Sequence, residues 1–210
     1  MTYAQIYAEA LRLMFATLSD DIGDSAAIIE ELVDNVNYRD YMLLMPGSVN
    51  RCFADLEAKK VLPWKTARVG SADGDKVGGG YRRVLLSEIA TDCYEIERVL
   101  QRREYGDEII LTAGEDYYVE GDELILIPGE IVIKYTPALP RIGEWTSLNV
   151  PAPLPEALAA AVPYYVKSEL YRREEPDEAA EAHSIYEQRV AQVTPEPSRV
   201  QTAVKMVYGF

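Results

Sequence analysis

Short apolar runs separated by turn residues stand out over residues 106–140. The runs consist of β-branched and aromatic residues, and glycine, aspartate or proline lies between them. Glycine supplies the positive φ of tight turns, and proline ends a strand because it has no N–H to donate. The pattern predicts a compact antiparallel meander of short strands. The predicted strands cover residues 109–111, 117–119, 124–127 and 131–133.

The sequence on both sides of this stretch mostly shows apolar residues at three- and four-residue spacing, which is typical of amphipathic helices. Pro46-Gly47 predicts a firm break before one of these helices, and Pro163 should kink another or begin it anew. The last two helices would form an antiparallel hairpin. The predicted helices cover residues 2–18, about 25–37, 49–60, 155–175 and 177–193.

Three further segments complete the pattern. Residues 64–80, which contain Gly78, Gly79 and Gly80, show no periodicity and are predicted to form a flexible or extended loop. Residues 82–86 are a strand candidate. Residues 93–101 could form a strand or a short helix, and a strand is favoured because the segment leads into the meander.

These elements predict an α+β fold, mainly a helical bundle with an inserted small antiparallel β-meander. The predicted organisation is N-terminal helices of the body (1–63), a flexible Gly-rich loop (64–80), an inserted β-region (81–140), a C-terminal helical hairpin of the same body (141–193) and an extended C-terminal arm (194–210).

The C-terminal arm differs from an ordinary polar chain end. Apolar residues alternate with other residues from 200 to 210, which is strand periodicity. A frayed terminus is the alternative, but frayed ends are usually polar. We expect the arm to pair with a sheet edge, in its own chain or in a neighbour. The contact residues expected in the arm are Val200, Val204, Met206, Tyr208 and Phe210.

Composition narrows the classes of function. The 210 residues include 35 acidic and 21 basic ones, a formal charge of -14, and no Lys/Arg cluster exceeds a pair. This charge disfavours a free nucleic-acid binder or a protein of anionic membrane surfaces. Two cysteines, Cys52 and Cys93, are too few for a disulfide framework and are expected to be buried free thiols. No signal peptide or membrane span is predicted, and a soluble protein made in a reducing cytoplasm is expected.

No motif in the chain predicts a reaction, a metal or a cofactor. The one histidine, His183, lies in a predicted helix, where a packed or surface role is the commoner one. The acidic pairs Asp20/Asp21 and Asp73/Asp75 lack a calcium-loop pattern, and the glycine run at 78–80 is not followed by the residues of a phosphate loop. Paired carboxylates can be drawn anywhere in so acidic a chain, so they are uninformative.

Tyrosine is the compositional oddity, with 15 Tyr against 3 Phe. Tyrosine joins an apolar ring to a polar tip and is enriched at protein–protein interfaces. A core that happens to use tyrosine explains the helical positions well, but it explains Tyr117 and Tyr118 of the meander less well. We therefore expect Tyr117, Tyr118 and the glycines at 78–80 to contact partners.

Several stretches resemble the head–tail connector (adaptor) proteins of tailed bacteriophages. They are DYYVEGDELIL at 116–126, GEIVIKY at 129–135 followed by Pro140, the helical pair that begins with LPEAL at 154–158, and LMPGSVNR at 44–51. The resemblance covers most of the chain in order and type. It does not extend to residues 64–80 or to the C-terminal arm.

The resemblance implies a non-enzymatic structural protein of the virion neck, made in the bacterial host cytoplasm. Such proteins form a homo-oligomeric ring, commonly of twelve copies, that docks on the portal protein, lets DNA pass through its lumen and presents a surface to tail or tail-completion proteins. Neither a cofactor nor a membrane is implied. The alternatives are another virion component, such as a tail-tube or tail-completion protein, an acidic hydrolase that uses paired carboxylates, and a cytosolic adaptor that binds one protein partner.

Overall fold

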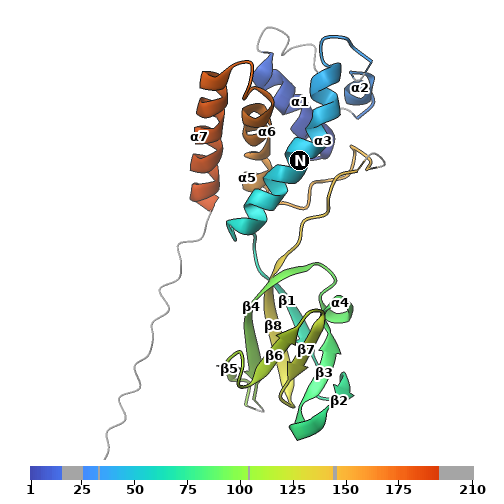
Figure 1. Ribbon diagram of the computed structural model, residues 1–210, viewed down its shortest axis with the longest axis vertical. Coiled ribbons are helices and arrows are strands. Elements are labelled where there is room, and N and C mark those ends of the chain that lie inside the picture. The colour runs from blue at the N-terminus through green and yellow to red at the C-terminus, as the bar shows by residue number, and fades with distance from the viewer. Residues whose placement is uncertain (16–25, 33, 104, 144–145, 194–210) are drawn as a thin grey trace, which may run out of the picture.

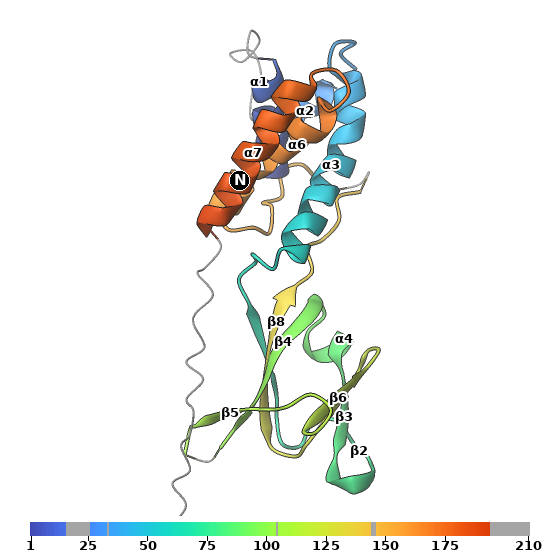
Figure 2. The ribbon, with the colours of Figure 1, turned by 60° about the vertical axis from the view of Figure 1, so that its left-hand side comes forward.

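In the computed structural model, helices and strands occupy separate parts of an elongated molecule (Figure 1). The structure describes residues 1–15, 26–32, 34–103, 105–143 and 146–193. The chain begins in a helical part, crosses to a sheet part of residues 65–137 and then returns to the helical part (Figure 2). The helical part comprises α1 (Tyr3–Met14), α2 (Ala26–Glu31), α3 (Arg39–Ala58), α5 (Glu156–Ala159), α6 (Val162–Leu170) and α7 (Pro176–Val193).

One apolar core holds the helical part together. Helices α1, α3, α6 and α7 each contribute a buried face, as their sequence periodicity predicts. Helix α1 begins at a reciprocal cap, in which Gln5 N–H donates to Thr2 Oγ1 at 3.3 Å and Thr2 N–H donates to Gln5 Oε1 at 2.9 Å. The fully buried large side chains of this core include Ile6, Leu11, Phe53, Leu158, Val166 and Tyr186.

The break predicted at Pro46-Gly47 is wrong, because helix α3 runs through both residues. Proline in a helix interior removes one backbone donor and disfavours the helix locally. Here Met42, Met45 and Val49 lie on one continuous face and are at most 4% exposed. Burial of that face outweighs the local preference, since most helical stability in proteins comes from tertiary packing.

Of the two outcomes predicted for Pro163, a kinked helix or a new helix, the structure shows the new helix. Helix α5 ends at Ala159, and α6 begins at Val162 with Pro163 in its first turn. Proline is tolerated there because the first N–H groups of a helix have no intrahelical partner. The helical segment after residue 155 therefore begins anew at this proline.

The sheet part consists of two four-stranded antiparallel sheets. The first has the order β1-β8-β4-β5 and the second the order β2-β3-β7-β6. The short helix α4 (Leu86–Ile89) follows β3. The strands are β1 (Lys65–Val69), β2 (Asp75–Lys76), β3 (Arg82–Leu85), β4 (Cys93–Arg102), β5 (Glu108–Ile110), β6 (Tyr117–Glu120), β7 (Glu123–Leu126) and β8 (Glu130–Pro137).

The predicted single meander over 106–140 is wrong in its pairing. Of the strands within residues 106–140, only β6 and β7 pair with each other, and the two-residue turn Gly121-Asp122 closes their hairpin. Strand β5 pairs with β4, and β8 pairs with β1 and β4. The four segments are strands, but they are divided between two sheets, because residues from before the predicted meander supply the partners of β5 and β8.

The loop predicted over 64–80 is also wrong in part. Residues Lys65–Val69 form β1, and Asp75–Lys76 form β2. Strand β1 was not predicted because its sequence has few apolar residues. Only Ala67 and Val69 of this strand are buried. The strands predicted at 82–86 and 93–101 are confirmed as β3 and β4.

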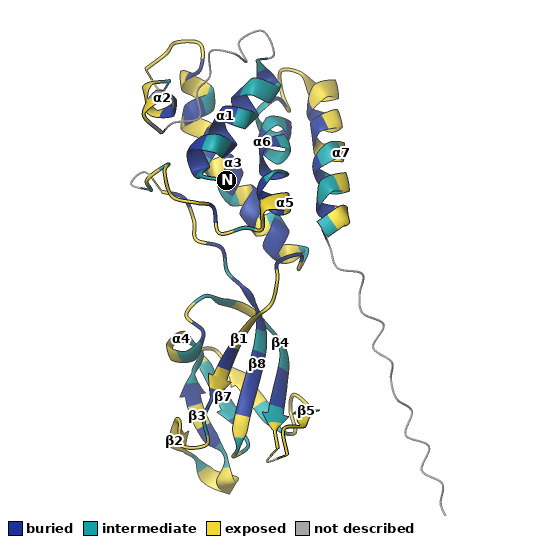
Figure 3. Cartoon of the chain, turned by 180° about the vertical axis from the view of Figure 1, so that it is seen from behind, coloured by how far each residue is buried: buried dark blue, intermediate teal, exposed yellow. Residues whose placement is uncertain are grey.

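A second apolar core lies between the two sheets. It combines Val69, Val99 and Ile133 of the first sheet with Leu124 and Leu126 of the second. Buried positions run along the central strand β8, and exposed positions gather at β2 (Figure 3). The structure is 42% helical and 24% strand. The expectation of mainly a helical bundle is therefore wrong, and the fold is mixed, since the strands have a core of their own.

Candidate functional site

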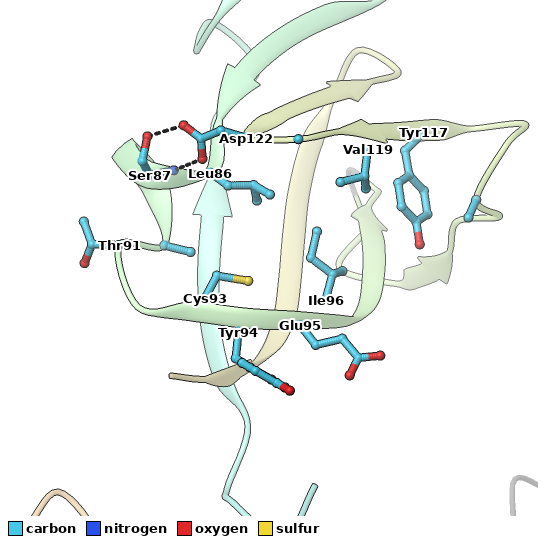
Figure 4. Close-up of a pocket in the computed structure, with 13 residues that line it drawn as sticks. Leu86, Ser87, Thr91, Cys93, Tyr94, Glu95, Ile96, Tyr117, Val119 and Asp122 are labelled. Atoms are coloured by element: carbon cyan, nitrogen blue, oxygen red, sulfur yellow. Dashed lines mark hydrogen bonds between the residues drawn. The ribbon is translucent and has the colours of Figure 1, made fainter. Parts of the chain in front are cut away.

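An apolar groove opens between the two sheets of the sheet part (Figure 4). Its volume is about 580 Å³. The lining comes from α4, the first residues of β4, and β6 with its following turn. The side chains that point into it include Leu86, Cys93, Ile96, Tyr117 and Val119.

Strand geometry explains which residues face the groove. Tyr117 and Val119 of β6 enter the groove (Figure 4). Successive side chains of a strand point to opposite faces, so Tyr118, between them, belongs to the other face of the strand. Strand β4 changes register against β8 at two places, between Cys93 and Glu95 and again after Ile96. Such irregularities bend a strand and increase its twist. They occur in the stretch of β4 that lines the groove.

The rim of the groove is fixed by contacts between α4 and the β6–β7 turn. Asp122 accepts Ser87 N–H at 2.9 Å through Oδ1 and the Ser87 hydroxyl at 2.5 Å through Oδ2. The backbone C=O of Asp122 also accepts Leu86 N–H at 2.8 Å. These three bonds hold the first turn of α4 against the turn of the hairpin, and Figure 4 shows the two that Ser87 donates to the Asp122 carboxylate.

The outer edge of β6 is used within the chain at one of its two outward-facing residues. Tyr117 C=O accepts Gly114 N–H at 2.8 Å, and Val119 is the residue left unused. Glu120 and Glu123 flank the two-residue turn and form a hydrogen-bonded pair, so the next pair, Val119 with Leu124, is a non-bonded one. The N–H and C=O of Val119 therefore face away from β7. No backbone bond from elsewhere in the described residues reaches them.

Cys93 supplies the one thiol among the lining residues of the groove, and its environment suppresses its reactivity. Burial, followed by the nearby charge of Asp92, raises the pKa of the Cys93 thiol. A raised pKa keeps the group as a thiol rather than a thiolate at neutral pH. Cys52 is fully buried, as predicted, whereas Cys93 is only half-buried.

The predicted contact residues of the second sheet lie on two different faces. Tyr118 packs on Tyr81 with ring centroids 6.0 Å apart, on the face away from the groove. Tyr81 also donates its hydroxyl to Glu115 C=O at 3.0 Å. Tyr81 follows Gly78–Gly80, which form an exposed turn between β2 and β3. The glycines thus adjoin the Tyr118 face, while Tyr117 belongs to the groove.

Large apolar side chains are also exposed in the helical part. Leu43 and Leu44 of α3 are 62% and 57% exposed, and Val36, just before that helix, is 89% exposed. Leu43 and Leu44 are neighbours in one helix, which makes them candidates for a contact surface. Neither this surface nor the groove was predicted, although Leu43-Leu44 on the polar side of a helical pattern is a signal that was available.

A second cavity of the sheet part is acidic. Its volume is about 730 Å³, and it lies beside β2, β3 and α4. Asp73, Asp75, Glu88 and Glu123 contribute carboxylates to its lining, and Arg83 contributes a guanidinium. Arg83 Nε lies 3.3 Å from Glu123 Oε2, so one of these carboxylates is already paired. Among the described residues, no group of three or more His, Cys, Asp or Glu is arranged to hold a metal ion.

Five of the predicted contact residues belong to the C-terminal arm. The described residues do not include these five, which are Val200, Val204, Met206, Tyr208 and Phe210. They do not include the Asp20/Asp21 pair either. His183 is an exposed residue of α7 that packs near the rings of Tyr165 and Tyr186, as a helical surface histidine does.

None of the described helices combines the length and the apolar character that crossing a membrane requires. Comparison with known families finds no model that matches the chain, and no curated protein matches it. The functional proposal therefore depends on the geometry above and on the resemblance noted in the sequence.

Proposed function

We propose that the chain is a virion structural protein of a tailed bacteriophage, a head–tail connector that acts by assembly rather than catalysis. In this role a homo-oligomeric ring docks on the portal, lines the DNA exit channel and presents a surface to tail proteins. The proposal begins from the resemblance at residues 116–126, 129–135 and 154–158.

The observation that carries the proposal is the presence of exposed apolar residues in both parts of an elongated chain. Leu43 and Leu44 lie in the helical part, and Ile110 and Val119, 59% and 48% exposed, lie in the sheet part. A connector must contact one protein on the head side and another on the tail side. Exposed apolar side chains in both parts of the chain supply contacts of that kind.

The charge of the chain supports the same role. With a formal charge of -14, the protein repels the phosphates of DNA rather than binding them. DNA that passes through a ring must slide without being held. An acidic subunit suits that requirement, whereas a basic subunit would retain the DNA.

Native mass spectrometry and negative-stain microscopy of the purified chain, alone and mixed with portal protein, test the proposal. We expect rings, either of the chain alone or on the portal. Leu44→Asp introduces a charge into the exposed surface of the helical part and should weaken assembly, while the far-UV circular dichroism stays unchanged. A protein that is strictly monomeric and ignores the portal contradicts the proposal.

One observation favours a second candidate, an acidic hydrolase. The cavity of about 730 Å³ brings together carboxylates from three segments, among them Asp75 and Glu88. Paired carboxylates can act as general acid and base. The test is an assay of glycoside and ester hydrolysis. Activity that is lost in both Asp75→Asn and Glu88→Gln would support this candidate. Activity that neither change affects would exclude it.

A further inference from the structure

The groove of the sheet part offers what an added β-strand requires. The outer edge of β6 presents the N–H and C=O of Val119, which β7 does not use. Beside that edge lies apolar space of about 580 Å³, with Ile96 and Tyr117 among its lining residues. A strand that pairs with a sheet edge gains affinity from main-chain bonds and specificity from pockets that take alternate side chains.

The lining of the groove carries acidic but no basic side chains. Glu95 and Asp122 line it, and none of its lining residues is Lys or Arg. A basic segment therefore complements the groove better than an acidic one.

One segment of the chain matches both properties. Residues 199–210 place Val204, Met206 and Tyr208 on one side of a strand pattern. The same twelve-residue segment carries Arg199 and Lys205 and has no acidic side chain, in a chain whose formal charge is -14. It is therefore the apolar, basic complement of the groove.

The segment can also reach such a site. Helix α7 ends at Val193, at the end of the helical part nearest the sheet part (Figure 2). The residues from 194 to 210 span up to about 60 Å when extended. A second copy that lies beside the first is within that reach.

We propose that residues 199–210 of a second copy of this chain add as a strand to the outer edge of β6 and place their apolar side chains in the groove. The inference rests on the proposed homo-oligomeric ring. The donor segment and the acceptor groove are different surfaces of one chain, so the contact is heterologous. Heterologous contacts generate rings when their rotation closes, which is the symmetry that a connector requires.

Cys93 provides a native probe inside the groove. In the full-length Met206→Cys variant, mild oxidation with diamide should join Cys93 of one copy to the introduced cysteine of another. Because a disulfide requires Cα atoms about 4.4–6.8 Å apart, only a seated segment will react efficiently. We expect covalent oligomers on denaturing gels. Their yield should fall at least tenfold in Val207→Cys, whose side chain lies on the opposite face of the strand, and in Met206→Cys combined with Cys93→Ala.

A pair of substitutions checks that the groove is the acceptor. Val119→Asp in the Met206→Cys background should lower the yield of covalent oligomers at least tenfold, because it places a carboxylate in the groove. Val150→Asp is the matched control, since Val150 is equally exposed at 48% but lies away from the groove, and it should leave the yield unchanged.

The outcomes separate this inference from the proposed function. A bond between Cys93 and residue 206 of the same chain overturns the inference. So does the absence of any bond under conditions in which a small disulfide reagent labels Cys93, a check that the raised pKa of this thiol makes necessary. Rings in native mass spectra without the bond leave the connector proposal intact. The absence of any oligomer, with or without portal, counts against the connector proposal itself.

Discussion

Glu57 and Arg141 form an ion pair at the junction between the helical part and the sheet part, with Arg141 Nη2 2.5 Å from Glu57 Oε2. The side chain of Glu57 is only 1% exposed, and its other oxygen accepts Leu139 N–H at 2.6 Å. Glu57 lies in the last turns of α3, and the other two residues belong to the segment that follows β8. The pair therefore joins the two chain segments that cross between the parts.

Arg141→Met should destabilise the protein by about 2–3 kcal/mol, because it leaves a buried carboxylate without its charged partner. Lys60→Met is the matched control. Lys60 and Arg141 have the same side-chain exposure, 47%, but the near partner of Lys60 is Glu95, which is itself 46% exposed. Its second partner, Glu97, is 16% exposed but more distant, at 3.6 Å. The control should leave the free energy of unfolding almost unchanged, since exposed pairs are worth little. Urea unfolding followed by circular dichroism measures both, and equal effects would show that the burial of Glu57 is unimportant.

Arg82 of β3 bonds to the backbone of two other segments of the sheet part, the loop after β1 and the turn before β8. The guanidinium of Arg82 donates to the C=O groups of Gly70, Asp73 and Gly129, and the residue is 4% exposed. Among the described residues, no carboxylate lies within ion-pair distance of it. Burial lowers the pKa of Arg82, and the charge of Asp73 partly offsets that shift. The charge is held by carbonyl dipoles of the loop after β1 and of the turn before β8.

Arg82→Met should cost about 2–3 kcal/mol of unfolding free energy, because buried carbonyl groups lose their donor. Arg83→Met, next to it on the exposed side of β3, loses only a surface pair with Glu123 and should cost under about 1 kcal/mol. Chemical denaturation distinguishes the two. Limited proteolysis should cut Arg82→Met faster between β1 and β3, and unchanged cleavage there would contradict the role of Arg82 in joining these segments.

Strand positions could be predicted from the sequence, but strand partners could not. Residues 117–119 and 124–127 carry local signals in their β-branched and aromatic side chains, and the turn between them needs a glycine with positive φ, which Gly121 supplies at 63°. Pairing depends on contacts far apart in the chain. The central strand β8 lies between β1 and β4, and β1 has too few buried residues to produce a detectable pattern.

The candidate site was predictable only in part, for the same reason. Tyr117 and Tyr118 were predicted to contact partners because the chain is rich in tyrosine, and both lie in β6. Their separation onto two faces follows from the alternation of side chains, which the sequence contains. The groove needs Leu86, Cys93 and Val119 from three elements, and no spacing in the sequence brings those three together.

Two glycines should respond in opposite directions to the same substitution. At Gly47, inside α3, an added Cβ would meet only Arg51 Nη1 at 3.6 Å, an ordinary contact. Gly47→Ala should stabilise the protein by about 0.5–1 kcal/mol, because alanine loses less conformational freedom in a helix. Gly74 has φ +85°, and a Cβ there would lie 2.2 Å from Arg83 O. Gly74→Ala should destabilise by more than about 2 kcal/mol. Thermal unfolding of both variants measures the contrast, and a change of the same sign in both would contradict it.

Tyr135 should make the free energy of unfolding depend on pH in the alkaline range. Its hydroxyl donates to Asp92 Oδ1 at 2.9 Å, and Asp92 is in turn paired with Lys65. Burial, together with the bond to Asp92, raises the pKa of Tyr135 to about 12. The unfolded side chain titrates near 10, so between about pH 10 and pH 12 the unfolded state loses a proton that the folded state keeps.

The free energy of unfolding should therefore fall as the pH rises from about 10 to 12, and the contribution of Tyr135 should be complete below pH 10. Tyr135→Phe cannot ionise, so its unfolding free energy should fall less steeply over that range, although it is lower at pH 7 by about 1 kcal/mol for the lost hydrogen bond. Tyr41→Phe is a useful comparison, because the bond to Glu174 and burial raise the pKa of Tyr41 to about 12 as well, but in the helical part. Urea unfolding at pH 8, 10 and 11 gives the slopes. If Tyr135→Phe and the unmodified chain lose stability equally between pH 10 and 11, the phenol of Tyr135 is not protected by Asp92.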